Sequence, residues 1–253
     1  MNLTENQSLS PVHLARTAGI LYLLIIICGL FSEVYVRSSL IVQGDAALTA
    51  NNIITNELLF RIGFISDMTM LLCDLAIAII FYVLLKPVSH TLALGAAFLR
   101  LIMDAILAVN LLNHFSSLLL LSGDNYLSAF DENQINSLIY LSLESHSIGY
   151  AIGLTFFAFH CLLLGYLIYR SDYFPKIIGA MLSIASISYL TDSVATFLFA
   201  GYETENYAII MLPALLAELS LCLWLLFIGV KQSQKPNQAI ESTSSNFIPA
   251  NKS

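Results

Sequence analysis

The chain has 253 residues, of which 58% are hydrophobic and only 11% are charged, and its formal net charge is −7. An average soluble domain has about 25% charged residues, so this composition excludes a protein whose whole surface faces water. The acidic balance gives no support to nucleic-acid binding, which needs a basic patch. We therefore expect an integral membrane protein whose main partner is the lipid bilayer.

Six apolar stretches are long enough to cross a membrane, because a hydrocarbon core of about 30 Å needs roughly 20 residues of helix. They cover residues 17–36, 62–85, 92–121, 148–169, 177–199 and 208–230. No small-x-small cleavage site follows the first stretch, which favours a retained helix over a signal peptide. The sequence predicts an all-α, polytopic six-helix transmembrane domain at 17–230. A cytoplasmic segment at 1–16 and a disordered cytoplasmic tail at 231–253 flank it.

The basic residues outside the apolar stretches predict the orientation, since Lys and Arg accumulate in cytoplasmic loops. With the N-terminus inside, the inner loops and tails hold seven of these residues, and the outer loops hold only Arg37 and Arg61. We therefore expect both termini to be cytoplasmic.

The second outer loop has a helical signal of its own. Asp131 followed by Gln134 is the pattern of a capping box, and apolar residues within 135–143 then share one helical face. This segment is expected either to lie on the membrane surface or to extend the fourth helix beyond the bilayer.

Five ionisable side chains from four predicted helices share one layer near the middle of the membrane. Counted from the inner end of each helix, their depths are about 14 Å for Arg100, about 15 Å for His160, about 18 Å for Asp74, and about 20 Å for Asp104 and Glu218. Asp192 lies slightly further out, at about 24 Å. A charged side chain at the bilayer centre costs about 2.5 to 3.5 kcal/mol, so we expect these groups to face the bundle interior.

Arg100 is expected to pair with Asp104, one turn along the same helix, and with Asp74 across an interface. The acids still outnumber the one deep arginine. An unpaired carboxylate in a low dielectric tends to bind a proton or a cation. Two interpretations stay open: the cluster is hydrogen-bonded interhelical structure, or it binds a proton, a small molecule or a lipid.

Two stretches of the sequence, "LARTAGILYLLIIICGLFSEVYVRSSLIV" and "FFAFHCLLLGYLIYRSDYFPKIIGAMLSIASISYLTDS", resemble the bacterial membrane-protein family catalogued as domain of unknown function 4386. The most specific part of the pattern consists of His160, Gly165, Tyr166, Leu167, Arg170, Ser171, Pro175 and Gly179. The resemblance extends to about Val230 and implies a six-helix, multi-pass protein of the bacterial inner (plasma) membrane. It implies no activity.

Three functional classes remain open on these grounds. The first is a non-catalytic membrane protein that binds a proton or small ligand at the polar cluster, and the second is a proton- or cation-coupled transporter. The third, an intramembrane metal-dependent hydrolase, would have to use a site such as His160, Asp74 and Glu218. Nothing resembles a nucleophile elbow, so no catalytic residue is predicted.

The sequence predicts no metal-ligand set and no cofactor. It has no Cys-x-x-Cys or His-x-x-x-His spacing. His114 and His160 differ in depth by about 20 Å, so they cannot share one metal ion or one haem. By depth, His146 is the histidine that could lie beside His114.

Overall fold

The computed structural model describes residues 10–123, 127–199, 202 and 207–230. The disordered tail predicted at 231–253 and most of the N-terminal segment therefore lie outside the described residues. Within these ranges every regular element is a helix.

Six helices are long and apolar enough to cross a membrane, as the sequence predicted. The first is α1, Pro11–Leu30, which continues without interruption through the π-helical segment η1, Phe31–Arg37, and the short helix α2, Ser38–Leu40. The others are α4 (Glu57–Leu85), α5 (His90–Leu120), α6 (Glu132–Arg170), α7 (Lys176–Leu198) and α8 (Tyr207–Phe227). A further short helix, α3 (Ala46–Thr55), connects α2 to α4. The all-α, six-helix membrane fold is thus confirmed.

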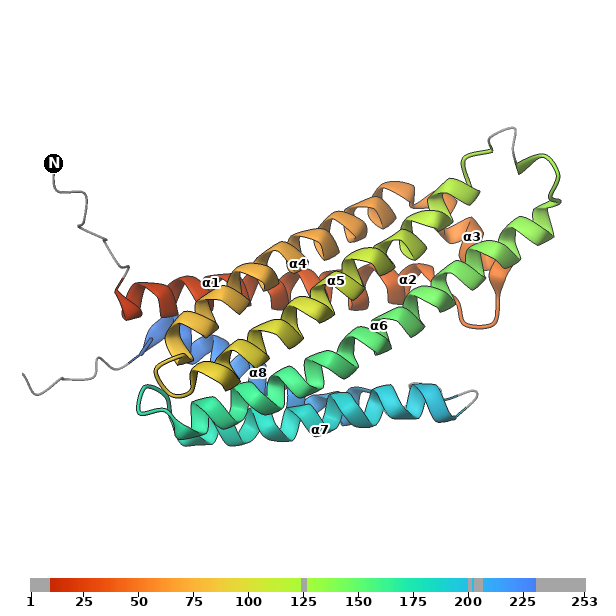
Figure 1. Cartoon of the computed structure of the whole chain (residues 1–253). Coiled ribbons are helices and arrows are strands. Elements are labelled where there is room, and N and C mark those ends of the chain that lie inside the picture. Colours follow the sequence, from red (N-terminus) through yellow and green to blue (C-terminus); the bar gives the residue numbers. More distant parts are fainter. Residues whose placement is uncertain (1–9, 124–126, 200–201, 203–206, 231–253) are drawn as a thin grey trace, which may run out of the picture.

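The helices form a closed ring in which neighbours along the chain are neighbours in space (Figure 1). After α1, helices α4, α5, α6, α7 and α8 pack successively on one another, and α8 returns to α1. The start of α1 and the end of α8 lie at the same end of the bundle, and α3 lies at the other (Figure 1). A ring of this kind creates an interior where polar side chains are shielded from lipid.

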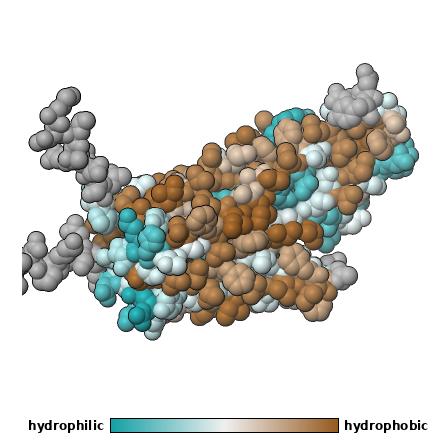
Figure 2. Space-filling view, in the orientation of Figure 1, coloured by the Kyte–Doolittle hydropathy of each residue, from teal (hydrophilic) through white to brown (hydrophobic). Residues whose placement is uncertain are grey.

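The outer surface of the ring is apolar. Large hydrophobic side chains are exposed on every long helix, among them Leu72, Val109, Ile187 and Leu216. Figure 2 shows hydrophobic residues over most of the middle of the visible face, and hydrophilic residues gathered mainly toward its ends. Such a surface suits lipid and would be costly in water.

The segment expected to be helical in the second outer loop is continuous with the fourth long helix, α6, which agrees with one of the two alternatives predicted from the sequence. Its capping box forms: the Asp131 side chain accepts from the Gln134 backbone, and the Gln134 side chain accepts from the Asp131 backbone. With 39 residues the helix is about 58 Å long, roughly twice the thickness of a hydrocarbon core. Its outer part packs against α3.

Small residues allow the closest approaches between helices. A Cβ added to Gly165 of α6 would lie 2.7 Å from the carbonyl oxygen of Gly179 in α7. A Cβ on Gly153 would lie 2.8 Å from the Leu107 side chain of α5. These glycines serve packing inside the bundle and bring α6 close to α5 and α7.

Candidate functional site

The central polar cluster is built around Arg100 of α5. Among the described residues it is the largest side chain with less than 2% of its surface exposed. Its Nη2 donates to Oδ1 of Asp74 in α4, and this ion pair joins the two helices. Asp74 was one of two partners expected from the sequence. The other expectation, a pair with Asp104 along α5, was wrong: Arg100 turns toward Asp74 and His160, which lie on neighbouring helices.

His160 of α6 holds Arg100 from a second side. Its Nε2 lies 3.0 Å from Nη1 of Arg100, and its Nδ1 lies 2.8 Å from the carbonyl oxygen of Ala96. A guanidinium group only donates and a carbonyl oxygen only accepts, so these contacts require a proton on Nδ1 and a bare Nε2. We therefore assign His160 as the neutral Nδ1–H tautomer.

Two aromatic rings complete the surroundings of the guanidinium group. Its Cζ lies 5.7 Å from the ring centroid of Tyr22 in α1 and 5.3 Å from that of Phe157 in α6. Both distances are within the range of a cation–π interaction. Arg100 is therefore fixed by contacts from α1, α4 and α6.

Asp104 differs from its neighbours because no N–H or hydroxyl group among the described residues donates to either of its carboxylate oxygens. The side chain is nevertheless buried, with 6% of its surface exposed. It interacts electrostatically with Arg100 and lies close enough to Asp74 for a hydrogen bond between the two carboxyl groups when one of them holds a proton. The cluster thus contains a buried pair of carboxyl groups, of which only Asp74 is bound by the arginine.

Glu218 of α8 lies at the edge of the same cluster. It accepts a hydrogen bond from the hydroxyl of Tyr189 in α7 and interacts electrostatically with Arg100 and Asp74. Five of the residues singled out from the sequence therefore come together from four helices. These are Asp74, Arg100, Asp104, His160 and Glu218.

The structure places Asp192, the sixth of these residues, in different surroundings. It is buried on α7 and accepts a hydrogen bond of 3.3 Å from the hydroxyl of Tyr202, which follows the C-terminal end of that helix. Glu218 and Asp192 thus accept from different tyrosines, Tyr189 and Tyr202 respectively. Asp192 takes no part in the contacts that hold Arg100.

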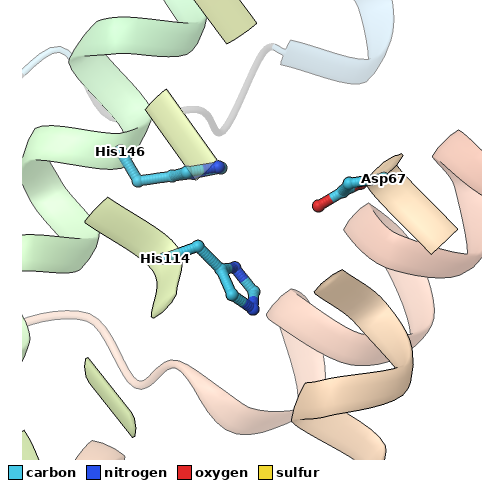
Figure 3. Close-up of side chains that lie close together, drawn as sticks. All are labelled: Asp67, His114 and His146. Atoms are coloured by element: carbon cyan, nitrogen blue, oxygen red, sulfur yellow. The ribbon is translucent and has the colours of Figure 1, made fainter. Parts of the chain in front are cut away.

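A second polar cluster, called the outer cluster below, comprises Asp67 of α4, His114 of α5 and His146 of α6. It lies closer to the end of the bundle that the loop charges predict to face outward. All three are buried, and one ligand atom from each lies within 4.8 Å of the others. Figure 3 shows the three side chains pointing into a common space. The two imidazole centroids are 5.6 Å apart, so the depth comparison of His114 with His146 is confirmed.

Arg37 belongs to this outer cluster, although the sequence analysis placed it in an outer loop. Its Nη1 donates to Oδ2 of Asp67 at 2.7 Å, and its Nε donates to Glu33 at 2.8 Å. The loop assignment was wrong because the first helix continues through η1 to Leu40, which carries Arg37 into the bundle. Asp67, the acid that compensates the buried charge of Arg37, is 30 residues away in the sequence.

Sequence reasoning did not single out Asp67, His114 and His146 as one site. Each comes from a different helix, so no short spacing motif marks them. A signal was present in their similar depths, because Asp67 and His114 fall in the outer half of their predicted helices and His146 lies two residues before the fourth. What the sequence could not supply was the rotation of each helix about its axis.

Comparison with known proteins agrees with this architecture. The model of the family described as "Domain of unknown function (DUF4386)" matches residues 17–229. An uncharacterized protein of Archaeoglobus fulgidus is 30% identical over 164 residues, which cover 65% of this chain and 82% of the relative. No solved structure matches the chain. The family noted from the sequence is confirmed: this chain, which has six potential membrane-spanning helices, belongs to the DUF4386 family. Its assignment to a bacterial inner membrane stays a prediction.

Proposed function

We propose that this protein binds and releases a proton, or a small cation in its place, at the central cluster around Asp104. The observation that carries the proposal is the burial of Asp104 beside Asp74, with no N–H or hydroxyl donor to its carboxylate oxygens in the described part of the chain. Proton binding at this depth is the step that a proton-coupled carrier requires.

Charge balance supports this proposal. The central cluster contains three carboxyl groups and one arginine, and the arginine is committed to Asp74. An ionised carboxylate without a cation is costly near the bilayer centre. Asp104 and Glu218 can avoid this cost by holding a proton or by binding a cation from outside. If the cluster had only a structural role, we would expect a protein group to donate to Asp104, as the Tyr189 hydroxyl donates to Glu218.

A small cavity beside His160 supports a route for exchange. It is lined by α4, α5 and α6 from Leu85 and Ala93, near the turn at the inner end, to His160 at the cluster. It has room for about one water molecule, which is enough for a proton to be relayed but not for a large substrate. The ligand that fits this interior is accordingly a proton or a small ion.

The loop charges support a location in the plasma membrane with both termini in the cytoplasm. Four described basic residues lie at the end of the bundle where α1 begins and α8 ends, namely Arg16, Lys86, Arg170 and Lys176. With this orientation Leu85 and Ala93 lie on the cytoplasmic side of the cavity beside His160. A carrier of bacterial inner-membrane type would then exchange its proton from that side.

The metal-dependent hydrolase considered from the sequence has little support at His160, Asp74 and Glu218. His160 and Asp74 both bind the guanidinium group of Arg100. A permanent positive charge between two ligands disfavours a metal cation at that position. The central cluster is therefore better suited to protons than to a metal.

Infrared difference spectroscopy tests the proposal without a substrate. In detergent or liposomes, a pH change between about 5 and 9 should produce a carboxylic-acid C=O band distinct from the carboxylate bands. Asp104→Asn should remove such a band, and Glu218→Gln should remove a second one at a different frequency, because Glu218 has a Tyr189 donor and Asp104 has none.

Asp192→Asn is the matched control, because it removes a buried acid outside the central cluster. Its spectrum should keep the bands assigned to Asp104 and Glu218. A wild-type spectrum with no titrating carboxyl band, or the same spectrum in Asp104→Asn and Glu218→Gln as in the wild type, would overturn the proposal.

A further inference from the structure

We infer that Asp67, His114 and His146 form a binding site for one divalent transition-metal ion in the outer half of the bundle. This site is separate from the central cluster and does not depend on its proposed function. Two imidazole nitrogens and one carboxylate oxygen suit Zn²⁺, Fe²⁺, Co²⁺ or Ni²⁺ better than Mg²⁺ or Ca²⁺, which prefer oxygen ligands.

The positions of the ligand atoms fit such an ion after a small adjustment. They lie within 4.8 Å of one another. Around a tetrahedral zinc ion with bonds of about 2.0 to 2.2 Å, neighbouring ligand atoms are about 3.3 Å apart. Side-chain rotations that move the ligand atoms by about 1 Å would bring them to coordination distance, and α4, α5 and α6 need not be rearranged.

His114 is prepared for coordination by its second nitrogen. Its Nε2 lies 3.4 Å from the carbonyl oxygen of Phe60, to which only an N–H can donate. Its Nδ1 is then bare, and this buried atom has no hydrogen-bond partner among the described residues. A metal-binding histidine characteristically donates its other N–H to a carbonyl or carboxylate, which fixes the tautomer. The ring also stacks on Phe60, with centroids 4.0 Å apart.

Asp67 is held in a similar way. Arg37 donates to its Oδ2, while its Oδ1 is buried and has no partner within the residues that the structure describes. The free oxygen and the free nitrogen of His114 are thus two unused acceptors at one place. Either a metal cation or a water molecule that donates to both can satisfy two buried acceptors at once, and the third ligand atom, from His146, favours the cation.

The local charges also allow a divalent cation. Asp67 and Glu33 carry two negative charges against the single positive charge of Arg37, so the group has a net charge of −1 with neutral histidines. Binding of M²⁺ changes this to +1, and an anionic ligand such as hydroxide would bring it to zero. Arg37 therefore orients Asp67 without cancelling the attraction for the ion.

Three protein ligands leave at least one coordination position open, which is typical of catalytic rather than structural zinc sites. A small cavity adjoins the cluster and is lined by Asp67, His146, Asn110, Tyr150 and apolar residues of α4 and α5. It has room for about one water molecule. The open position would therefore hold a water or a single small donor group.

Cobalt(II) titration tests the site, because its d–d absorption reports the number and type of ligands. The full chain is purified through an affinity tag that contains no histidine, treated with a chelator and titrated with Co²⁺. We expect one Co²⁺ per chain, a visible band of four- or five-coordinate type, and displacement of that band by one equivalent of Zn²⁺. His114→Gln and His146→Gln should weaken binding at least tenfold.

His90→Gln is the matched control, since His90 is exposed at the start of α5, and it should bind Co²⁺ as the wild type does. A wild-type chain that takes up no stoichiometric metal would overturn the site. So would folded His114→Gln and His146→Gln variants that bind with unchanged affinity. If these variants do not fold, the wild-type spectrum still decides, because an intense near-ultraviolet charge-transfer band would reveal thiolate ligands from the four free cysteines and contradict the assignment.

Discussion

Arg100 and His160 face each other inside the membrane with their nitrogens 3.0 Å apart, and the histidine accepts from the arginine. This arrangement requires a neutral imidazole, whose N–H is directed to the backbone of Ala96. The Nε–H of Arg100 is buried with no hydrogen-bond partner among the described residues, so the guanidinium still has an unused donor. The direction in which the guanidinium group points, and not the number of its donors, leaves Asp104 without a hydrogen bond from Arg100.

Removal of one member of the Arg100–Asp74 pair should destabilise the protein strongly, because the other member stays buried. Asp74→Ala or Arg100→Ala leaves a buried charge uncompensated and should lower the free energy of unfolding by about 3 to 5 kcal/mol. The double variant should lose clearly less than the sum of the two. Thermal unfolding in detergent measures all three. The exposed pair Glu57–Arg61 is the control, and Arg61→Ala should cost at most about 1 kcal/mol.

His160→Leu should destabilise the protein by about 1 to 3 kcal/mol, because Arg100 loses an acceptor and the Ala96 carbonyl loses a donor inside the bundle. His90→Leu, which changes an exposed histidine, should alter stability by no more than about 0.5 kcal/mol. Unfolding temperatures of the two variants provide the comparison. Equal losses would show that the His160 contacts contribute nothing.

Gly179→Ala should separate α6 from α7. The new Cβ would lie 2.6 Å from the Tyr169 backbone nitrogen, which cannot move aside as a flexible side chain could. We expect a loss of about 1 to 3 kcal/mol from this overpacking. Gly95→Ala is the matched change, because its Cβ would meet only Leu163, at 3.5 Å, and alanine favours the helix by about 0.5 to 1 kcal/mol. Equal stability of the two variants would contradict the close approach.

The proposed orientation predicts which residues an impermeant thiol reagent can reach in intact cells. In a background without the native cysteines, Ala129→Cys in the loop between α5 and α6 should be labelled, because the loop is assigned to the outside. His90→Cys, at the start of α5, should be labelled only after the membrane is opened. The reverse pattern would place both termini outside.

The sequence by itself determined the architecture of this protein. The lengths of its apolar stretches, the low charge content and the capping box of Asp131 and Gln134 are local features, and the six spans and the extended α6 follow from them. Helical periodicity also predicted that Asp74, Arg100 and Asp104 would face the interior, because polar groups cannot face lipid. Depth counting then placed them in one layer.

The tertiary structure decided which of these groups are partners. Arg100 had an acid one turn away on its own helix, yet it binds Asp74 and His160, because the rotation of α4 and α6 against α5 brings these two within hydrogen-bond distance. The same rotation places Asp67 beside His114, and it carries Arg37 into the bundle. Helix rotation depends on contacts spread over whole interfaces, such as the approach of α6 to α7 at Gly165 and Gly179. No local pattern in a single helix contains that information.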